Sequence, residues 1–362
     1  MNAKNTLFTF AATPIIVFLL MFAIYLGNPL AFHFRAWEFF DIFVYNGFYG
    51  RQHHLIETGD SSRNYLFQRY SAANTVSVNE FGNRIACYDV NRTEKPRVLL
   101  VGDSQLFASG TDDGATFSAQ LCRLYEANVY DGSRRNGLSL LRVESFRFDA
   151  ILFTTTERHP LAAQYCPTLD QLAAEYDQKI PDRDIRLPRA TLAGLYEVLT
   201  KGEKFFVGYM KSRLQALFTS ILLGPVAPTR HIIIASHRYQ PVEPVVANDI
   251  ACAQKLSAFF EAKGLAVGFL YFPSHQTLYG KEADFAVDED TASYIDRMSA
   301  KLAAAGLRTM NTKECLNKVK SRTLVYQIHD THLNADGYRS LAECVGRSDL
   351  SALVAPDTII ER

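Results

Sequence analysis

Alternating apolar runs and amphipathic stretches divide the middle of the chain into strands and helices. Short apolar runs bounded by glycine or polar residues predict strands buried on both faces of a sheet, at 98–102, 128–130, 150–154, 232–235 and 266–272. Apolar residues at helical spacing predict helices at 114–125, 138–146, 245–263, 291–305 and 334–345, with a short segment at 307–310. Because strands and helices alternate, the pattern predicts an α/β fold with a five-stranded, parallel, doubly wound sheet.

Residues 161–228 interrupt this alternation. They contain three helical stretches divided by proline or glycine, at about 169–178, 189–200 and 203–223. The run from Leu214 to Leu223 is strongly apolar but too short to span a bilayer. We interpret this helical insertion as a cap or a partner-contact element.

The N-terminal stretch carries no charge and no histidine from Thr6 to Phe32. After a short tail at 1–6, residues 7–27 are long enough for one transmembrane helix. A cleaved signal peptide is the alternative, but the apolar part is longer than usual and lacks a clear small-x-small cleavage site. We expect an uncleaved anchor with the N-terminus inside and the body of the protein outside.

The region between the anchor and the first predicted strand, residues 28–95, has two parts. An aromatic-rich piece, 32–45, fits an interfacial segment, a dock for another membrane protein, or a core-packing helix. Residues 46–95 are polar and broken by Asn, Ser and Gly, which favours a connector with little regular structure. The catalytic domain is then expected at 96–350, followed by a tail at 351–362.

Charge and cysteine content narrow the class of protein. Lys plus Arg equals Asp plus Glu, at 38 each, so the composition gives no reason to expect a nucleic-acid partner. All six cysteines follow the anchor and none forms a C-x-x-C pair. An even count is compatible with disulfides in an oxidising compartment, and buried free thiols are the alternative. Six cysteines allow 15 complete pairings, among which the sequence does not choose.

Polar residues gather where the predicted strands end. These motifs are Gly102-Asp103-Ser104, Asp131-Gly132, Thr156-Glu157-Arg158 and Pro273-Ser274-His275. The loop before the last predicted helix, His329–Tyr338, is also rich in polar residues. A serine nucleophile needs a base, and the base needs a carboxylate that fixes its tautomer. Ser104, His332 and Asp330 supply these three roles. The alternative is structural, with Asp103 or Ser104 only capping a helix.

These motifs resemble those of the SGNH (GDSL-type) esterases and acyltransferases, over roughly residues 97–345. Gly102-Asp103-Ser104 matches the nucleophile block, Gly132 the glycine of the second block, and Asp330-Thr331-His332-Leu333-Asn334 the acid–base block. The resemblance implies an SGNH-like, flavodoxin-like sheet. More narrowly, the chain is similar to membrane-anchored, alginate-type exopolysaccharide O-acetyltransferases, through Asp-Thr-His, the segment Pro273–Tyr279 and the pair Glu157-Arg158.

The resemblance also implies roles for single residues. The oxyanion would be held by Ser104, Gly132 and Arg158, and the substrate by Arg158, His275 and Tyr279. No metal and no cofactor are expected. The chain departs from the family because the third-block Asn is absent, with Arg158 near its place, and because His329 stands where many relatives carry Asp. In the alginate-type relatives Asp-Thr-His also precedes the serine block, whereas here it follows. A salt bridge to Glu157 or Asp149 is the alternative role for Arg158.

Together these features predict a membrane-anchored, serine-dependent O-acyltransferase that acetylates an extracytoplasmic polysaccharide. It would be a single-pass protein of the inner (cytoplasmic) membrane with its catalytic domain in the periplasm. Its partners would be a polysaccharide acceptor, an acyl donor and a membrane-bound O-acyltransferase. Two alternatives stay open: an SGNH carbohydrate esterase or deacetylase, and an inactive binding or scaffold subunit of a polysaccharide modification complex.

Overall fold

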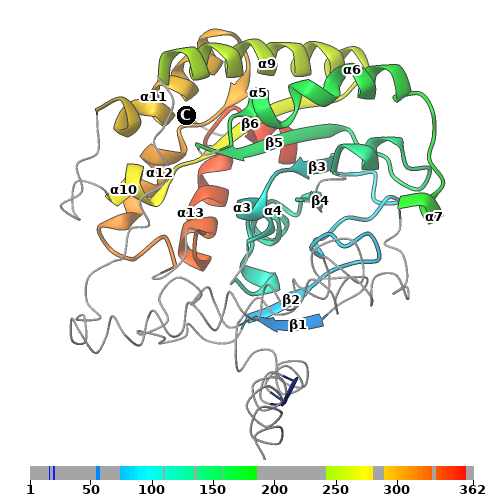
Figure 1. Cartoon of the computed structure of the whole chain (residues 1–362), viewed down its shortest axis with the longest axis horizontal. Coiled ribbons are helices and arrows are strands. Elements are labelled where there is room, and N and C mark those ends of the chain that lie inside the picture. Colours follow the sequence, from blue (N-terminus) through cyan, green and yellow to red (C-terminus); the bar gives the residue numbers. More distant parts are fainter. Residues whose placement is uncertain are drawn as a thin grey trace, which may run out of the picture.

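A computed structural model describes residues 54–57, 74–108, 111–133, 137–157, 159–185, 242–279, 289–327 and 332–355, with residues 16, 19 and 20. Its centre is a sheet of five parallel strands in the order β4-β3-β5-β6-β7 (Figure 1). The strands are β3 (Arg97–Val101), β4 (Asn128–Gly132), β5 (Ala150–Thr156), β6 (Ala266–Phe272) and β7 (Arg308–Thr309). The predicted α/β class and the five-stranded parallel sheet are therefore confirmed.

The order of the strands reverses between β3 and β5. From β3 the chain moves outward to β4, then crosses back to pair β5 on the other side of β3. In doubly wound sheets, ligands bind outside the carboxyl ends of the strands at such a switch point. The loops that follow β3 and β5 therefore occupy the place where a ligand is expected.

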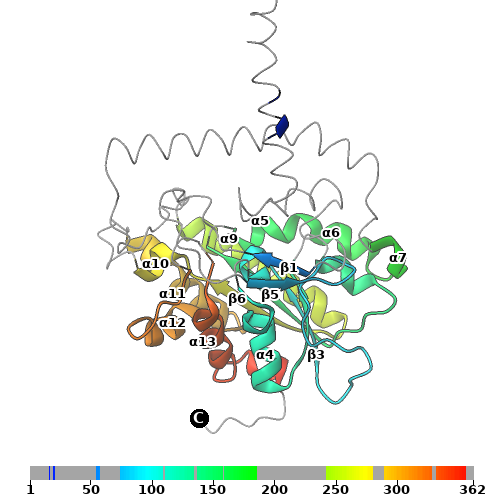
Figure 2. The same cartoon turned by 90° about the horizontal axis from the view of Figure 1, so that it is seen from below.

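Helices cover both faces of the sheet (Figures 1 and 2). One face packs against α5 (Leu161–Gln164), α6 (Cys166–Glu175), α9 (Val242–Ala262) and α11 (Glu289–Ala304). The other face packs against α4 (Phe117–Tyr125), α10 (His275–Tyr279), α12 (Thr312–Lys320), α13 (Ala335–Val345) and α14 (Ser351–Val354). Helices α4 and α13 lie side by side in both views.

Successive strand residues alternate between these two layers. Leu99 and Val101 of β3 join the core on the α9 side, and Leu100 joins the core on the α13 side. Ile151 and Leu152 of β5 divide in the same way. Because both faces are covered, both sets are apolar, which is why these strands read as unbroken apolar runs.

Several elements differ from the prediction. The predicted strand 232–235 lies outside the described residues, and β7, within the segment 307–310, is the fifth strand of the sheet. The stretch 138–146 is not an α-helix but begins with a 3₁₀ helix, η3 (Gly137–Arg142). The helices α10 and α12 were not predicted. Of the predicted insertion, the structure describes residues 161–185, which contain the helices α5, α6 and α7 (Asp182–Ile185). The rest of the insertion, 186–228, lies outside the described residues.

The predicted connector and tail contain regular structure. Strands β1 (His54–Glu57) and β2 (Asn74–Ser77) form an antiparallel pair within 46–95, where the sequence offered no apolar alternation long enough to show it. Helix α14 lies in the predicted tail, and Leu353 and Val354 are fully buried there. The folded domain therefore extends past residue 350. The aromatic-rich piece 32–45 lies outside the described residues.

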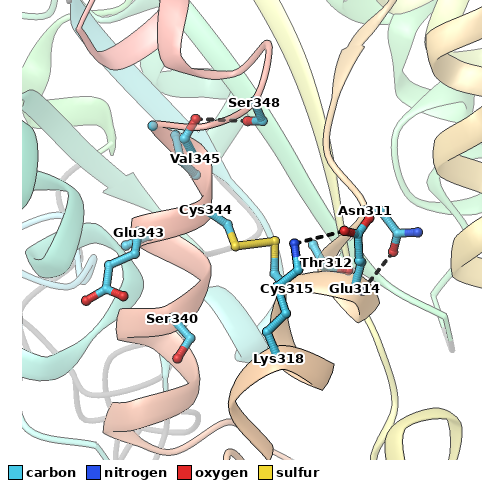
Figure 3. Close-up of a disulfide and its surroundings, with 12 residues drawn as sticks. Asn311, Thr312, Glu314, Cys315, Lys318, Ser340, Glu343, Cys344, Val345 and Ser348 are labelled. Carbon is cyan, nitrogen blue, oxygen red and sulfur yellow. Dashed lines mark hydrogen bonds and ion pairs between the residues drawn. A yellow bond between two sulfur atoms is a disulfide. The ribbon is translucent and has the colours of Figure 1, made fainter. Parts of the chain in front are cut away.

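All six cysteines are paired, in Cys87–Cys122, Cys166–Cys252 and Cys315–Cys344. The second disulfide joins α6 to α9, and the third joins α12 to α13 (Figure 3). The chain between α12 and α13 carries Asp330 and His332. The third disulfide thus ties together the two helices that flank the predicted acid–base loop.

The predicted membrane anchor falls almost entirely outside the described residues. Ile16, Leu19 and Leu20 are helical and more than half exposed. No helix in the described part of the chain is both long and apolar enough to cross a bilayer. The anchor at 7–27 stays a prediction.

Candidate active site

Ser104 stands at the end of β3, as the first residue of the single-turn helix α3 (Ser104–Phe107). Asp103 caps this turn, because its Oδ1 accepts a hydrogen bond from the Gln105 backbone N–H at 2.9 Å. Ser104 is exposed, whereas the other three residues of the turn are buried. The capping role considered as the alternative therefore belongs to Asp103, and Ser104 is not used for it.

Gly102 is required by the closeness of β5. A Cβ atom at this position would clash with Thr154 Oγ1 and lie 2.8 Å from Leu106 Cβ. The backbone at the end of β3 therefore packs directly against a β5 side chain, and the turn that carries Ser104 begins from this contact.

His332 lies on the loop that docks against α3. The Leu333 N–H donates to Gln105 Oε1 at 3.3 Å, and the Tyr338 hydroxyl donates to the Gln105 carbonyl oxygen at 2.6 Å. The His332 carbonyl accepts from the Gln327 N–H at 3.0 Å, and the His332 side chain is buried. The residues that follow Ser104 and His332 are thus hydrogen-bonded to each other. Asp330 lies outside the described residues, so its role stays a prediction.

Arg84 fixes the far end of α3. Its fully buried guanidinium donates to the Phe107 carbonyl at 3.2 Å and the Thr111 carbonyl at 2.7 Å, and it pairs with Asp113 at 3.0 Å. Ala108, the residue after the turn, has a left-handed backbone with φ of 58°. No local pattern points to this arginine, because it lies in the stretch interpreted as a connector.

Gly132 ends β4 beside Val101 of β3. A Cβ atom on Gly132 would lie 2.7 Å from the Leu100 carbonyl oxygen, and a Cβ on Gly137 would clash with the Gly132 carbonyl. Close packing of the backbone therefore already explains a glycine here. That the N–H groups of Gly132 and Ser104 hold an oxyanion stays a prediction.

Arg158 lies outside the described residues, and the two acids considered as its partners have other contacts. Asp149 accepts two hydrogen bonds from the Arg97 guanidinium, at 2.9 and 2.7 Å, and a third from the Arg97 backbone N–H at 2.9 Å. This pairing lowers the pKa of the Asp149 carboxyl, chiefly through the hydrogen bond from the guanidinium. Glu157 is buried and accepts from the Thr277 hydroxyl at 2.7 Å. The predicted oxyanion and substrate roles of Arg158 remain untested.

His275 and Tyr279 lie on α10 and contact the residues Tyr326 and Val325. The His275 ring stacks on Tyr326 with centroids 4.8 Å apart, and the Tyr279 hydroxyl accepts from the Val325 N–H at 3.1 Å. Both side chains are buried. These contacts give the two residues a packing role, and their predicted contact with substrate stays a prediction.

The buried carboxyl group of Asp131 precedes Gly132. It accepts from the Ser118 hydroxyl at 2.8 Å and from the Ser133 N–H at 3.2 Å. Burial outweighs these hydrogen bonds and raises the pKa of Asp131 from its ordinary 3.8 to about 6.

The structure also places an aspartate–histidine pair beside Ser104. Asp103 Oδ2 lies 3.0 Å from His159 Nδ1, and Thr156 Oγ1 lies 3.2 Å from the same nitrogen. The sequence did place His159 after the third predicted strand and Asp103 after the first. It did not pair them, because the two residues are 56 positions apart and meet only where β3 and β5 are neighbours.

Within the described residues, no group of three or more His, Cys, Asp or Glu side chains is placed to hold a metal ion. No known family model matches the chain, and no curated protein matches it significantly. The arrangement around Ser104 is therefore the basis for assigning a function.

Proposed function

We propose that the protein is a serine-dependent O-acyltransferase. The observation that carries this proposal is the exposed Ser104 at the sheet's switch point, on a turn that is hydrogen-bonded to the His332 loop through Gln105 and Leu333. An exposed serine on a turn that is hydrogen-bonded to a histidine-bearing loop, outside the carboxyl end of a parallel strand, is suited to acyl transfer when that histidine serves as its base.

In the proposed reaction, His332 takes the proton of the Ser104 hydroxyl as its oxygen attacks the carbonyl carbon of an acyl donor. The backbone N–H groups of Ser104 and Gly132, with Arg158, hold the oxyanion. The leaving group of the donor departs with the proton from His332. The acyl group is then bound to Ser104 as an ester. His332 then takes the proton of an acceptor hydroxyl as that oxygen attacks the ester, and it returns the proton to Ser104 Oγ as the bond between Ser104 and the acyl group breaks. Asp330 keeps the imidazole oriented throughout.

The finer proposal is O-acetylation of an extracytoplasmic polysaccharide by a membrane-anchored protein. Three disulfides support an oxidising compartment, because such bonds seldom persist in the cytosol. The resemblance of the motifs to alginate-type acetyltransferases supports the acetyl group, the polysaccharide acceptor and a membrane-bound acyltransferase as donor partner.

The first test is acylation by p-nitrophenyl acetate. A burst of p-nitrophenol, equal in amount to the enzyme, is expected together with a mass increase of one acetyl group on Ser104. The variants S104A and H332A should lose the burst. S145A is the matched control, because Ser145 is exposed but lies away from the carboxyl ends of the strands. A burst that survives in S104A would refute the proposed nucleophile.

The second test separates transfer from hydrolysis. The acetylated enzyme is incubated with oligosaccharides and the products are weighed by mass spectrometry. Acetylated sugar supports the acyltransferase, and free acetate alone supports the esterase. No turnover above that of S104A would support the inactive scaffold.

A further inference from the structure

The pair formed by Asp103 and His159 has no part in the reaction proposed above, although Asp103 is the residue before Ser104. The His159 side chain is 56% exposed, whereas Asp103 is 16% exposed. The His159 imidazole is thus exposed and is held by the carboxylate of Asp103, the residue before Ser104. In this position the imidazole can contact a substrate bound at Ser104.

The contacts of His159 fix how its ring presents its two nitrogens. Asp103 Oδ2 is a hydrogen-bond acceptor, so His159 Nδ1 carries the proton that lies between them. The Thr156 hydroxyl lies 3.4 Å from the same carboxylate oxygen, to which it donates, and its oxygen faces Nδ1 at 3.2 Å. In the neutral ring Nε2 then holds the lone pair, and it is an acceptor for a hydroxyl group.

The backbone around His159 is held as firmly as its ring. The His159 N–H donates to the Thr156 carbonyl at 3.0 Å, and the Thr155 hydroxyl donates to the His159 carbonyl. Two residues later Leu161 is fully buried, and its N–H donates to the buried Asp249 at 3.0 Å. The loop after β5 is therefore anchored on both sides of His159.

His332 and His159 belong to segments on opposite faces of the sheet. Leu333, next to His332, packs in the core on the α13 side. Leu161, close to His159, packs in the core on the α9 side. We therefore expect an acceptor whose reacting hydroxyl meets His332 to have another hydroxyl on the side of His159.

We propose that His159 is an acceptor-binding residue, oriented by Asp103, which accepts a hydrogen bond from a hydroxyl next to the one that is acylated. The substrate class that fits is a polyol with neighbouring hydroxyls, such as a sugar ring. The inference rests on the proposed acyltransferase function. It adds no proton transfer, because the proton of the reacting hydroxyl still goes to His332.

The test compares glycerol, which has neighbouring hydroxyls, with methanol, which has one. Full-length enzyme is acetylated by p-nitrophenyl acetate in the presence of either alcohol, and glyceryl acetate, methyl acetate and acetate are quantified. The wild type should favour glycerol over methanol. In H159A this preference should fall about tenfold, the loss expected for one hydrogen bond to substrate.

The variant D103N tests the orienting role. Asparagine caps a helix as well as aspartate does, but its amide can offer an N–H to His159 Nδ1. The ring should then carry its proton on Nε2, which no longer accepts from a hydroxyl. Nitrogen chemical shifts of His159 should report this change of tautomer, and the preference for glycerol should fall as in H159A. D170N is the matched control, because Asp170 is exposed on α6 and should change neither quantity.

The outcomes are distinguishable. A normal burst with an unchanged glycerol preference in H159A would overturn the role of His159 alone. A wild type without preference for glycerol, or an equal loss of transfer to both alcohols in H159A, would overturn it too. A wild type that gives no burst would refute the proposed function, and this inference with it.

Discussion

Asp131 offers a quantitative test of the site's electrostatics. Its carboxyl group is fully buried at the end of β4, and burial raises its pKa from 3.8 to about 6. In the pH range between these values the folded protein holds a proton that the unfolded chain has released. The stabilisation from this group is therefore complete below about pH 4 and is lost as the pH rises through about 6. A pKa difference of about 2 corresponds to about 3 kcal/mol of unfolding free energy.

The substitution D131N removes the titration and keeps the hydrogen bonds. The amide oxygen can accept from the Ser133 N–H, and the amide nitrogen can donate to Ser118 Oγ, whose own proton can turn to Thr116 Oγ1 at 3.0 Å. In D131N the buried carboxylate of the wild type is thus replaced by a neutral amide that is hydrogen-bonded to Ser133 and Ser118. We expect D131N to be about 1–3 kcal/mol more stable than the wild type at pH 7.5, with this difference vanishing near pH 4.

The assay is urea unfolding of full-length protein followed by circular dichroism at 222 nm, from pH 4 to pH 8. D170N, at an exposed aspartate on α6, is the control and should keep a constant difference from the wild type. The reasoning would be refuted by a D131N effect that is the same at pH 4 and pH 7.5. It would also be refuted if the wild type gained stability relative to D131N as the pH rose.

Two further predictions concern the frame around the site. G102A should lower the unfolding free energy by about 1–3 kcal/mol, because its Cβ clashes with Thr154 Oγ1. T154A should recover part of that loss in the double variant, and strictly additive effects in urea titrations would argue against a direct clash. Replacing Cys315 and Cys344 by serine should cost about 3–4 kcal/mol, since the disulfide closes a loop across 29 positions. Urea titration measures the cost, and mass spectrometry of the alkylated wild type, which should show no free thiols, checks the pairing.

The sequence predicts best what is buried on both faces. The runs around Leu99 and Ile151 are apolar because helices cover each side of the sheet, and a parallel sheet is their simplest interpretation. Strand β7 has only two residues, Arg308 and Thr309, and is too short for such a pattern. Strands β1 and β2 have four residues each, and they are recognisable only from their antiparallel pairing with each other.

In the candidate site, the features set by neighbouring residues in the chain can be predicted from the sequence, but contacts between distant segments cannot. The placement of Ser104 after a strand follows from local residues, and so does the capping by Asp103. The contact of Gln105 with Leu333 joins residues 228 positions apart, and it depends on how α13 packs against α4. The meeting of Asp103 with His159 requires the order of the strands, which the alternation of elements leaves open. The three disulfides likewise depend on which helices become neighbours.

The contact between Gly102 and Thr154 has a consequence for how substrate preference can vary. Because main chain packs against the neighbouring strand there, the start of α3 is set by the spacing of β3 and β5 and not by a side-chain rotamer. The residues that would meet an acceptor follow β5, beyond this contact. Substitutions among them can therefore alter which hydroxyl compound is bound while Ser104 keeps its place.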